Sequence, residues 1–200
     1  MVRFKINDIE VTAEPGWTVL ETAREYGIEI PTLCFHECVA ASGACRLCMV
    51  ELKEGSWSKL VASCVYPVKD GLTVYTKTER VKNVRRWILE MLLSETPASR
   101  EVQELARAHG VTSTRFNVKD PNEDCILCGL CTRVCEEVVG IAAISTQSRG
   151  VHKTIGPPFM QPSEACVACG SCVTVCPTGA MGRRIDLVRG RMNSEKARVA

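Results

Sequence analysis

Twelve of the thirteen cysteines in this 200-residue chain fall into three groups of four whose spacing suits metal ligation. Two of the groups share one spacing, C-x2-C-x2-C-x3-C, and Pro177 directly follows the second. Thiolate sulfur is a soft ligand that favours iron–sulfur clusters, and a [4Fe–4S] cluster takes four of them. The spacing therefore predicts two such clusters, whose chemistry is the transfer of single electrons. The first group is Cys125, Cys128, Cys131 and Cys135, and the second is Cys166, Cys169, Cys172 and Cys176.

Tandem runs of this kind usually exchange their last cysteines, as in bacterial two-cluster ferredoxins. Zinc is the alternative metal, but zinc sites are commonly built from separated C-x2-C pairs rather than three cysteines in tandem. We expect Gly129 and Gly170 to relieve crowding where the backbone approaches each cluster. By the crossing rule one cluster is held by Cys125, Cys128, Cys131 and Cys176, and the other by Cys135, Cys166, Cys169 and Cys172.

The remaining cysteines suggest a [2Fe–2S] site whose first ligand the spacing does not settle. Cys45, Cys48 and Cys64 are three candidate ligands. The plant-type spacing C-x4-C-x2-C requires a cysteine at position 40, where this chain has alanine. The fourth ligand is therefore Cys34 or Cys38, and spacing alone leaves both open.

Composition narrows the class of function. The net charge of +2 is far from the basic excess of a nucleic-acid-binding protein. We find no apolar stretch of about 18 residues that could span a membrane and no apolar core of a signal peptide, so we expect a cytoplasmic protein. Structural disulfides are rare in that compartment, which favours metal ligation. The sequence has no G-x-G-x-x-G turn, P-loop, flavin, molybdopterin or hydrogenase motif, so we expect no catalysis by the chain alone.

The elements that must position the first cysteines are predicted over residues 1–78. Alternating residues predict a hairpin that turns at Asn7 and Asp8, followed by a helix over 18–26 that begins with a capping box. A hairpin, one helix and further strands fit an α+β domain with the helix packed across the sheet. The further strands are expected at 47–52, 60–63 and 72–76.

The rest of the chain divides into three further segments. Apolar residues at three- and four-residue steps predict two helices without cysteine, which we interpret as a structured linker over 79–118. Residues 119–182 contain the repeated cysteine runs. Residues 183–200 form a basic tail, which we expect to be a solvated end or, alternatively, a docking segment.

The motifs resemble one family over almost the whole chain. The segment P-T-L-C-F-H-E-C-V-A-A-S-G-A-C-R-L-C-M-V-E-L, residues 31–52, resembles the N-terminal domain of the large iron–sulfur subunit of respiratory complex I. It is equally similar to the diaphorase iron–sulfur subunit of NAD-linked hydrogenases and to the N-termini of iron-only hydrogenases and NAD-dependent formate dehydrogenases. The runs C-I-L-C-G-L-C-T-R-V-C-E-E-V and C-V-A-C-G-S-C-V-T-V-C-P-T-G-A extend the resemblance. It implies a β-grasp [2Fe–2S] ferredoxin domain joined to a two-cluster [4Fe–4S] ferredoxin domain.

The resemblance also implies the ligands of the [2Fe–2S] cluster. In the family the first ligand follows P-T-L, which corresponds to Cys34 and leaves Cys38 as a non-ligand. The family usually has one more [4Fe–4S] cluster, held by one histidine and three cysteines. Here residues 93–110 contain no cysteine, and His109 falls too late to be that ligand, so we expect three clusters. The implied [2Fe–2S] ligands are Cys34, Cys45, Cys48 and Cys64.

The function implied by the resemblance is that of an electron-transfer subunit. Its expected partners are a flavoprotein subunit that oxidises NAD(P)H and a catalytic redox subunit, such as a hydrogenase, formate dehydrogenase or heterodisulfide-reductase-like module. A freestanding multi-cluster ferredoxin is the alternative, although simple ferredoxins are more acidic than this chain. The iron–sulfur subunit of succinate dehydrogenase or fumarate reductase requires a different cysteine spacing.

Overall fold

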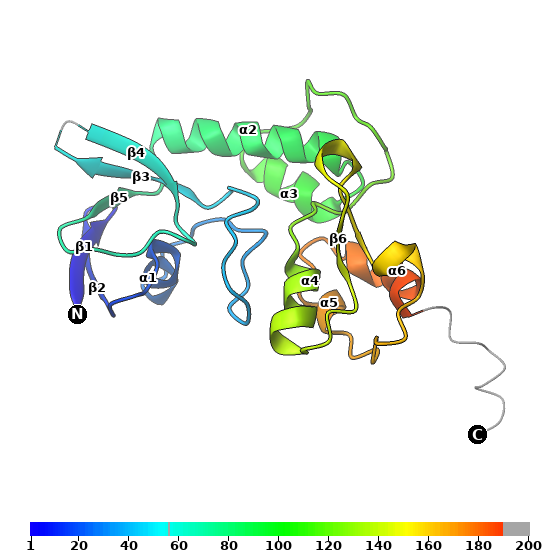
Figure 1. The fold of residues 1–200 in the computed structure, drawn as a ribbon. Helices are drawn as coiled ribbons and strands as arrows, with labels where there is room; N and C mark the ends of the chain where they lie inside the picture. Colours follow the sequence, from blue (N-terminus) through cyan, green and yellow to red (C-terminus); the bar gives the residue numbers. More distant parts are fainter. Residues whose placement is uncertain (56, 190–200) are drawn as a thin grey trace.

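The computed structural model describes residues 1–55 and 57–189, and places the cysteines in two regions connected by helices (Figure 1). The first region is built on a five-stranded sheet in the order β2-β1-β5-β3-β4. Helix α1 lies across this sheet, as the sequence predicts. The elements of this region are β1 (Val2–Ile6), β2 (Ile9–Ala13), α1 (Val19–Glu25), β3 (Met49–Glu54), β4 (Trp57–Ala62) and β5 (Thr73–Tyr75).

The sheet mixes antiparallel and parallel pairs. Strands β1 and β2 form the predicted hairpin, with Asn7 and Asp8 both at positive φ in its turn. Strand β5 lies parallel to β1 and antiparallel to β3. Strand β3 begins two residues later than predicted, because residues 45–48 belong to the loop that carries two of the cysteines.

The capping box predicted for the first helix is present. The hydroxyl of Thr18 accepts a hydrogen bond from the Glu21 amide (3.3 Å), and the Glu21 carboxylate accepts one from the Thr18 amide (2.7 Å). Gly27 follows the helix at φ 67°, a backbone conformation that glycine adopts at low cost. The buried face of α1 packs into the sheet core, and the chain leaving it runs directly to Cys34.

The two predicted helices without cysteine are α2 (Glu79–Glu95) and α3 (Arg100–Ala108), capped by Thr78 and Ser99. Their apolar faces pack in one core with the loops of the first region, so these two helices form a structured linker. Leu89 and Val102 are fully buried there beside Leu47, which lies between Cys45 and Cys48. The linker helices therefore support the loop that carries two candidate ligands.

The second region contains the two repeated runs. Each run enters a short helix, and a two-stranded antiparallel sheet, β6 with β7, lies between them. The elements are α4 (Leu130–Arg133), the π-helical turn η1 (Val134–Val138), β6 (Ser145–Gln147), η2 (Gly150–His152), β7 (Thr154–Gly156), η3 (Pro158–Met160), α5 (Ser171–Thr174) and α6 (Ala180–Arg189).

The end of the second region differs from the sequence expectation. Where we expected a basic tail from residue 183, α6 continues to Arg189. The physical reason is that Arg183 and Arg184 form ion pairs with Asp124. The rest of the predicted tail, residues 190–200, lies outside the described residues.

Candidate metal centres

The cysteines of the second region line two separate hollows. One hollow brings Cys176 of the second run to Cys125, Cys128 and Cys131 of the first, with Ile126, Leu130, Ile155 and Met181 among its apolar neighbours. The arrangement combines three cysteines of one run with the last cysteine of the other, which is what the crossing rule requires.

The other hollow has the reciprocal composition. It is lined by Cys135 of the first run together with Cys166, Cys169 and Cys172 of the second, and apart from Ser171 its remaining wall is apolar. Among residues 1–55 and 57–189, no three His, Cys, Asp or Glu side chains converge closely enough to hold a single metal ion. Four thiols around a largely apolar hollow are the set of ligands that a [4Fe–4S] cluster takes.

The two runs share an unusual backbone conformation. Leu127 and Ala168, at equivalent positions, have φ of 52° and 56°, and Gly129 and Gly170 follow at 75° and 80°. A non-glycine residue in this region is strained, and such strain concentrates at functional sites. A Cβ on Gly170 would meet no protein atom within 4 Å, so within the polypeptide the glycine is required by its positive φ.

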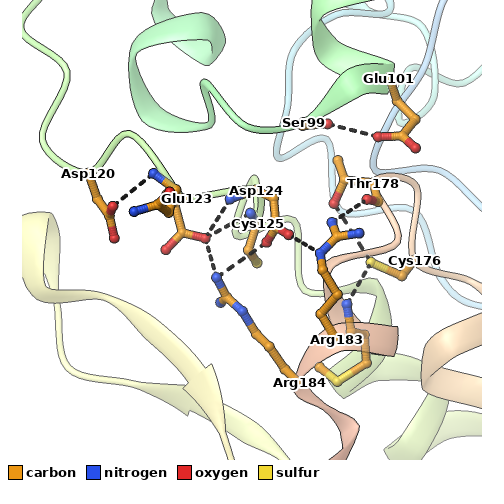
Figure 2. Close-up of polar contacts among 12 residues, drawn as sticks. Ser99, Glu101, Asp120, Glu123, Asp124, Cys125, Cys176, Thr178, Arg183 and Arg184 are labelled. Carbon is orange, nitrogen blue, oxygen red and sulfur yellow. Dashed lines mark hydrogen bonds and ion pairs between the residues drawn. The ribbon is translucent and has the colours of Figure 1, made fainter.

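Polar contacts hold the last cysteine of the second run beside the first run (Figure 2). The Arg183 guanidinium donates to the Asp124 carboxylate and to the carbonyl of Thr178 (3.1 Å). Asp124 directly precedes Cys125, and Thr178 lies two residues after Cys176. Arg183 therefore ties the start of one run to the end of the other.

A second arginine reinforces this connection. The Arg184 guanidinium donates to the carboxylates of Glu123 and Asp124, and Glu123 in turn accepts a hydrogen bond from the amide of Cys125 (2.8 Å), as Figure 2 shows. The sulfur of Cys176 accepts a bond from the Met181 amide at the start of α6 (3.4 Å). Helix α6 therefore holds Cys176 of the second run beside Cys125 of the first.

Burial controls the protonation of the thiols in the first hollow. It raises the pKa of Cys128 to about 11 and that of Cys131 to about 12, with the neighbouring cysteines adding to the rise. These thiols are protonated at neutral pH. Because iron binds the thiolate, loading this hollow must release protons, which makes assembly less favourable as pH falls.

The candidate [2Fe–2S] cysteines come together as two close pairs. The sulfur of Cys34 accepts a hydrogen bond from the Cys45 amide (3.3 Å), and the sulfurs of Cys48 and Cys64 are 3.4 Å apart. Hydrogen bonds from their partners lower the pKa of Cys34 and of Cys48. The hydrogen bond with Cys48 and burial raise the pKa of Cys64, and the charges of Cys48, Cys34 and Cys45 add to the rise, so the four sulfurs lie within electrostatic reach of one another.

Cys38 has different surroundings from these four. Its side chain is exposed, whereas Cys34, Cys48 and Cys64 are buried. Its amide donates to the Nδ1 atom of His36 (3.3 Å) in the same loop. This supports Cys34 as the first ligand.

Paired serine substitutions test that choice. We expect Cys34→Ser to abolish the [2Fe–2S] absorption and EPR signals of the anaerobically reconstituted chain, because a buried ligand is lost. We expect Cys38→Ser to leave both signals unchanged, because its exposed sulfur lies outside the group of four. The opposite pattern would assign Cys38 as the ligand.

The two cysteine regions contact each other through the loop that follows Cys34. The Arg133 guanidinium donates to the carbonyl of Ala40 and to that of Cys34 (3.1 Å), and the Glu137 carboxylate accepts from the Ala40 amide (2.8 Å). Val39, buried between these contacts, packs against Leu130, Val134 and Val175. The charge on Cys34 also contributes to raising the pKa of Cys128. The first hollow is therefore close to the candidate [2Fe–2S] cysteines.

Some residues that shape these sites were not predicted from the sequence. Arg133 and Glu137 flank Cys135, and no local signal in the sequence predicts their hydrogen bonds to the loop after Cys34. Arg183 and Arg184 follow the second run closely, but the sequence interpretation assigned them to a tail. His109 is the C-terminal cap of α3, and its Nδ1 atom lies 2.9 Å from the carbonyl of Leu105.

Comparison with protein families yields two matches, one in each cysteine region. A 2Fe-2S iron-sulfur cluster binding domain matches residues 1–79, and a 4Fe-4S dicluster domain matches residues 124–180. Their order agrees with the mixed helix-and-strand fold of the first region and the repeated runs of the second. In the part of the chain that the structure describes, no helix has the length and apolar character needed to cross a membrane.

Comparison with individual proteins identifies relatives of both regions. The chain is 33% identical to the NADH-ubiquinone oxidoreductase 75 kDa subunit of Reclinomonas americana, over 75% of this chain and 25% of that protein. It is 30% identical to the mitochondrial NADH-ubiquinone oxidoreductase 78 kDa subunit of Candida albicans, over 78% of this chain and 25% of that protein. The chain thus spans about a quarter of the length of these curated relatives.

A solved structure matches over a larger share of its own length. One chain in the crystal structure of an NAD+-reducing [NiFe]-hydrogenase in the H2-reduced state superposes with a TM-score of 0.69 and 34% sequence identity. The match covers 78% of this chain and 74% of that chain.

Proposed function

Because the chain belongs to the family of iron–sulfur subunits found in NADH-ubiquinone oxidoreductase and in NAD+-reducing [NiFe]-hydrogenase, we propose that it relays single electrons within a multi-subunit NAD(P)-linked oxidoreductase. The membership confirms the resemblance that the cysteine motifs suggest. On one side we place a flavoprotein that oxidises NAD(P)H, and on the other a catalytic redox subunit. These partners would perform the bond-making chemistry, and this chain would connect them.

We propose three clusters and twelve ligands. The [2Fe–2S] cluster would occupy the N-terminal domain, for which the parallel pairing of β1 with β5 and the helix across the sheet support a β-grasp fold. The two hollows support the crossed assignment of the two [4Fe–4S] clusters. The ligands would be Cys34, Cys45, Cys48 and Cys64 for the [2Fe–2S] cluster, Cys125, Cys128, Cys131 and Cys176 for the first [4Fe–4S] cluster, and Cys135, Cys166, Cys169 and Cys172 for the second.

The observation that carries the proposal is the direct contact between the two cysteine regions. Arg133 bonds the carbonyl of Cys34, and it lies only two residues before Cys135 and two after Cys131. When bound, the clusters supply carriers of one electron each. The polypeptide's contribution is to hold the three sites in fixed relation and to surround most of the sulfurs with apolar side chains, which limits the access of water.

Recovery of the full-length chain from its native host under anaerobic conditions tests the proposal. We expect a flavoprotein and a catalytic redox subunit to co-purify in stoichiometric amounts, and about ten iron atoms per chain, two plus four plus four. Recovery of the chain alone, still reducible in solution, would instead indicate a freestanding ferredoxin. An iron content of about fourteen would mean that a fourth cluster is bound.

A further inference from the structure

Arg85 is a buried cation with an incomplete set of hydrogen bonds. It lies in the middle of α2 with only 5% of its surface exposed. One guanidinium nitrogen, Nη2, donates to the carbonyl of Met49 (2.8 Å). The Nε atom is buried and has no hydrogen-bond partner. Such a charge is costly to bury unless a charge of opposite sign lies nearby.

No carboxylate among the described residues forms an ion pair with Arg85. The acidic residues near this part of α2 are engaged with other arginines: Glu51 lies 3.6 Å from Arg80, and Glu79 contacts Arg86. Burial lowers the pKa of Arg85 to about 10, so it keeps its proton at neutral pH. The acceptor that the guanidinium does have is the carbonyl of Met49, the residue directly after the candidate ligand Cys48.

The packing of α2 against the sheet explains why the Arg85 guanidinium lies beside Met49. The carbonyl that binds it belongs to Met49, the residue after Cys48, at the start of β3. Helix α2 packs against β3, with Leu89 buried one turn after Arg85. The neighbouring Arg86 is exposed and bonds Asn83 one turn earlier. Arg85 is thus buried and Arg86 exposed, although the two residues are adjacent in the same helix.

We propose that Arg85 is the counter-charge of the [2Fe–2S] site and raises its reduction potential. This rests on the proposed function, because it takes Cys34, Cys45, Cys48 and Cys64 as the ligands. Reduction moves one electron from an external reductant to the site and breaks no bond, so the site gains one negative charge. A fixed positive charge nearby favours the reduced form, and protein charge and hydrogen bonds are known determinants of cluster potential.

Anaerobic redox titration of the reconstituted full-length chain, followed by the EPR signal of the reduced [2Fe–2S] cluster, tests this role. We expect Arg85→Met to assemble the cluster and to make its reduction about tenfold less favourable, a fall of ~59 mV for a one-electron couple. Arg85→Lys keeps the charge and should stay closer to the wild-type potential than Arg85→Met does. Arg86→Gln, which removes a solvated charge next to it, should leave the potential unchanged.

The outcomes separate this inference from the proposed function. If the wild-type chain assembles no [2Fe–2S] cluster, the proposed function fails. If Arg85→Met assembles the cluster with the wild-type potential, the cluster assignment stands and the role of Arg85 is rejected. If the cluster fails to assemble in Arg85→Met, the reduction potential of Arg85→Gln decides, because glutamine can still donate a hydrogen bond to Met49 but carries no charge. Failure of both neutral variants would make Arg85 a folding residue and reject the proposal.

Discussion

Replacing Cys176 with serine is expected to remove the [4Fe–4S] cluster of the first run, although Cys176 belongs to the second. The hollow lined by Cys125, Cys128 and Cys131 takes its fourth sulfur from Cys176, which the Met181 amide and the neighbouring arginine network hold in place. Serine offers a harder oxygen ligand that suits the cluster poorly. We expect the iron content of the reconstituted chain to fall from about ten to about six atoms, with the [2Fe–2S] signal retained.

Double substitutions distinguish a crossed arrangement from an uncrossed one. If Cys176 and Cys131 serve the same cluster, Cys176→Ser combined with Cys131→Ser should lose no more iron than either single variant. The matched pair Cys176→Ser with Cys172→Ser should lose both [4Fe–4S] clusters and leave about two iron atoms. If instead the first pair lost both clusters and the second pair lost one, each run would hold its own cluster, and the crossed assignment would be wrong.

The cluster chemistry that we propose for this chain is suggested by its sequence because most of the proposed ligands are close together along the chain. Three of the four sulfurs in each [4Fe–4S] set lie within seven residues, so spacing alone predicts the cluster type. The hairpin, the capping box at Thr18 and the helices that begin after Thr78 and Ser99 are also local signals, and all are present. Each of these patterns can be recognised from a few consecutive residues.

The features that the sequence did not predict depend on pairs of residues far apart in the chain. Arg183 meets Asp124 across fifty-nine residues, and Arg133 meets Cys34 across ninety-nine. Arg85 differs from Arg86 only in the side of α2 on which it lies. A basic residue near a cysteine run has the same local pattern whether it is solvated or buried, and only the packed fold assigns its partner.

Substitution of Arg133 by methionine is expected to loosen the contact between the two cysteine regions without removing a ligand. Arg133 donates two charge-assisted hydrogen bonds, to the carbonyls of Cys34 and Ala40. Bonds of this kind contribute about 1.5–3 kcal/mol, and the half-buried position of Arg133 favours the lower value. The open state of the contact should therefore become about tenfold to a hundredfold more populated, at 1.4 kcal/mol per factor of ten.

The amide of Ala40 is a direct reporter of this contact, because it donates to Glu137 across the same interface. Hydrogen exchange at residues 38–42 should accelerate by about that factor in Arg133→Met, while exchange within α1 stays unchanged. The control is Arg107→Met, since Arg107 is exposed and bonds only Gln103 of its own helix among the described residues.

Iron content and cluster spectra of Arg133→Met should remain those of the wild type, because every proposed ligand is retained. The magnetic interaction between the reduced [2Fe–2S] and [4Fe–4S] clusters should weaken, because the loop that carries Cys34 is no longer fixed to the helix that precedes Cys135. Unchanged exchange at residues 38–42 would show that Val39 and its apolar neighbours suffice to hold the contact. In that case the relay geometry would depend on apolar packing, and substitution of Val39 would be the change that uncouples the two regions.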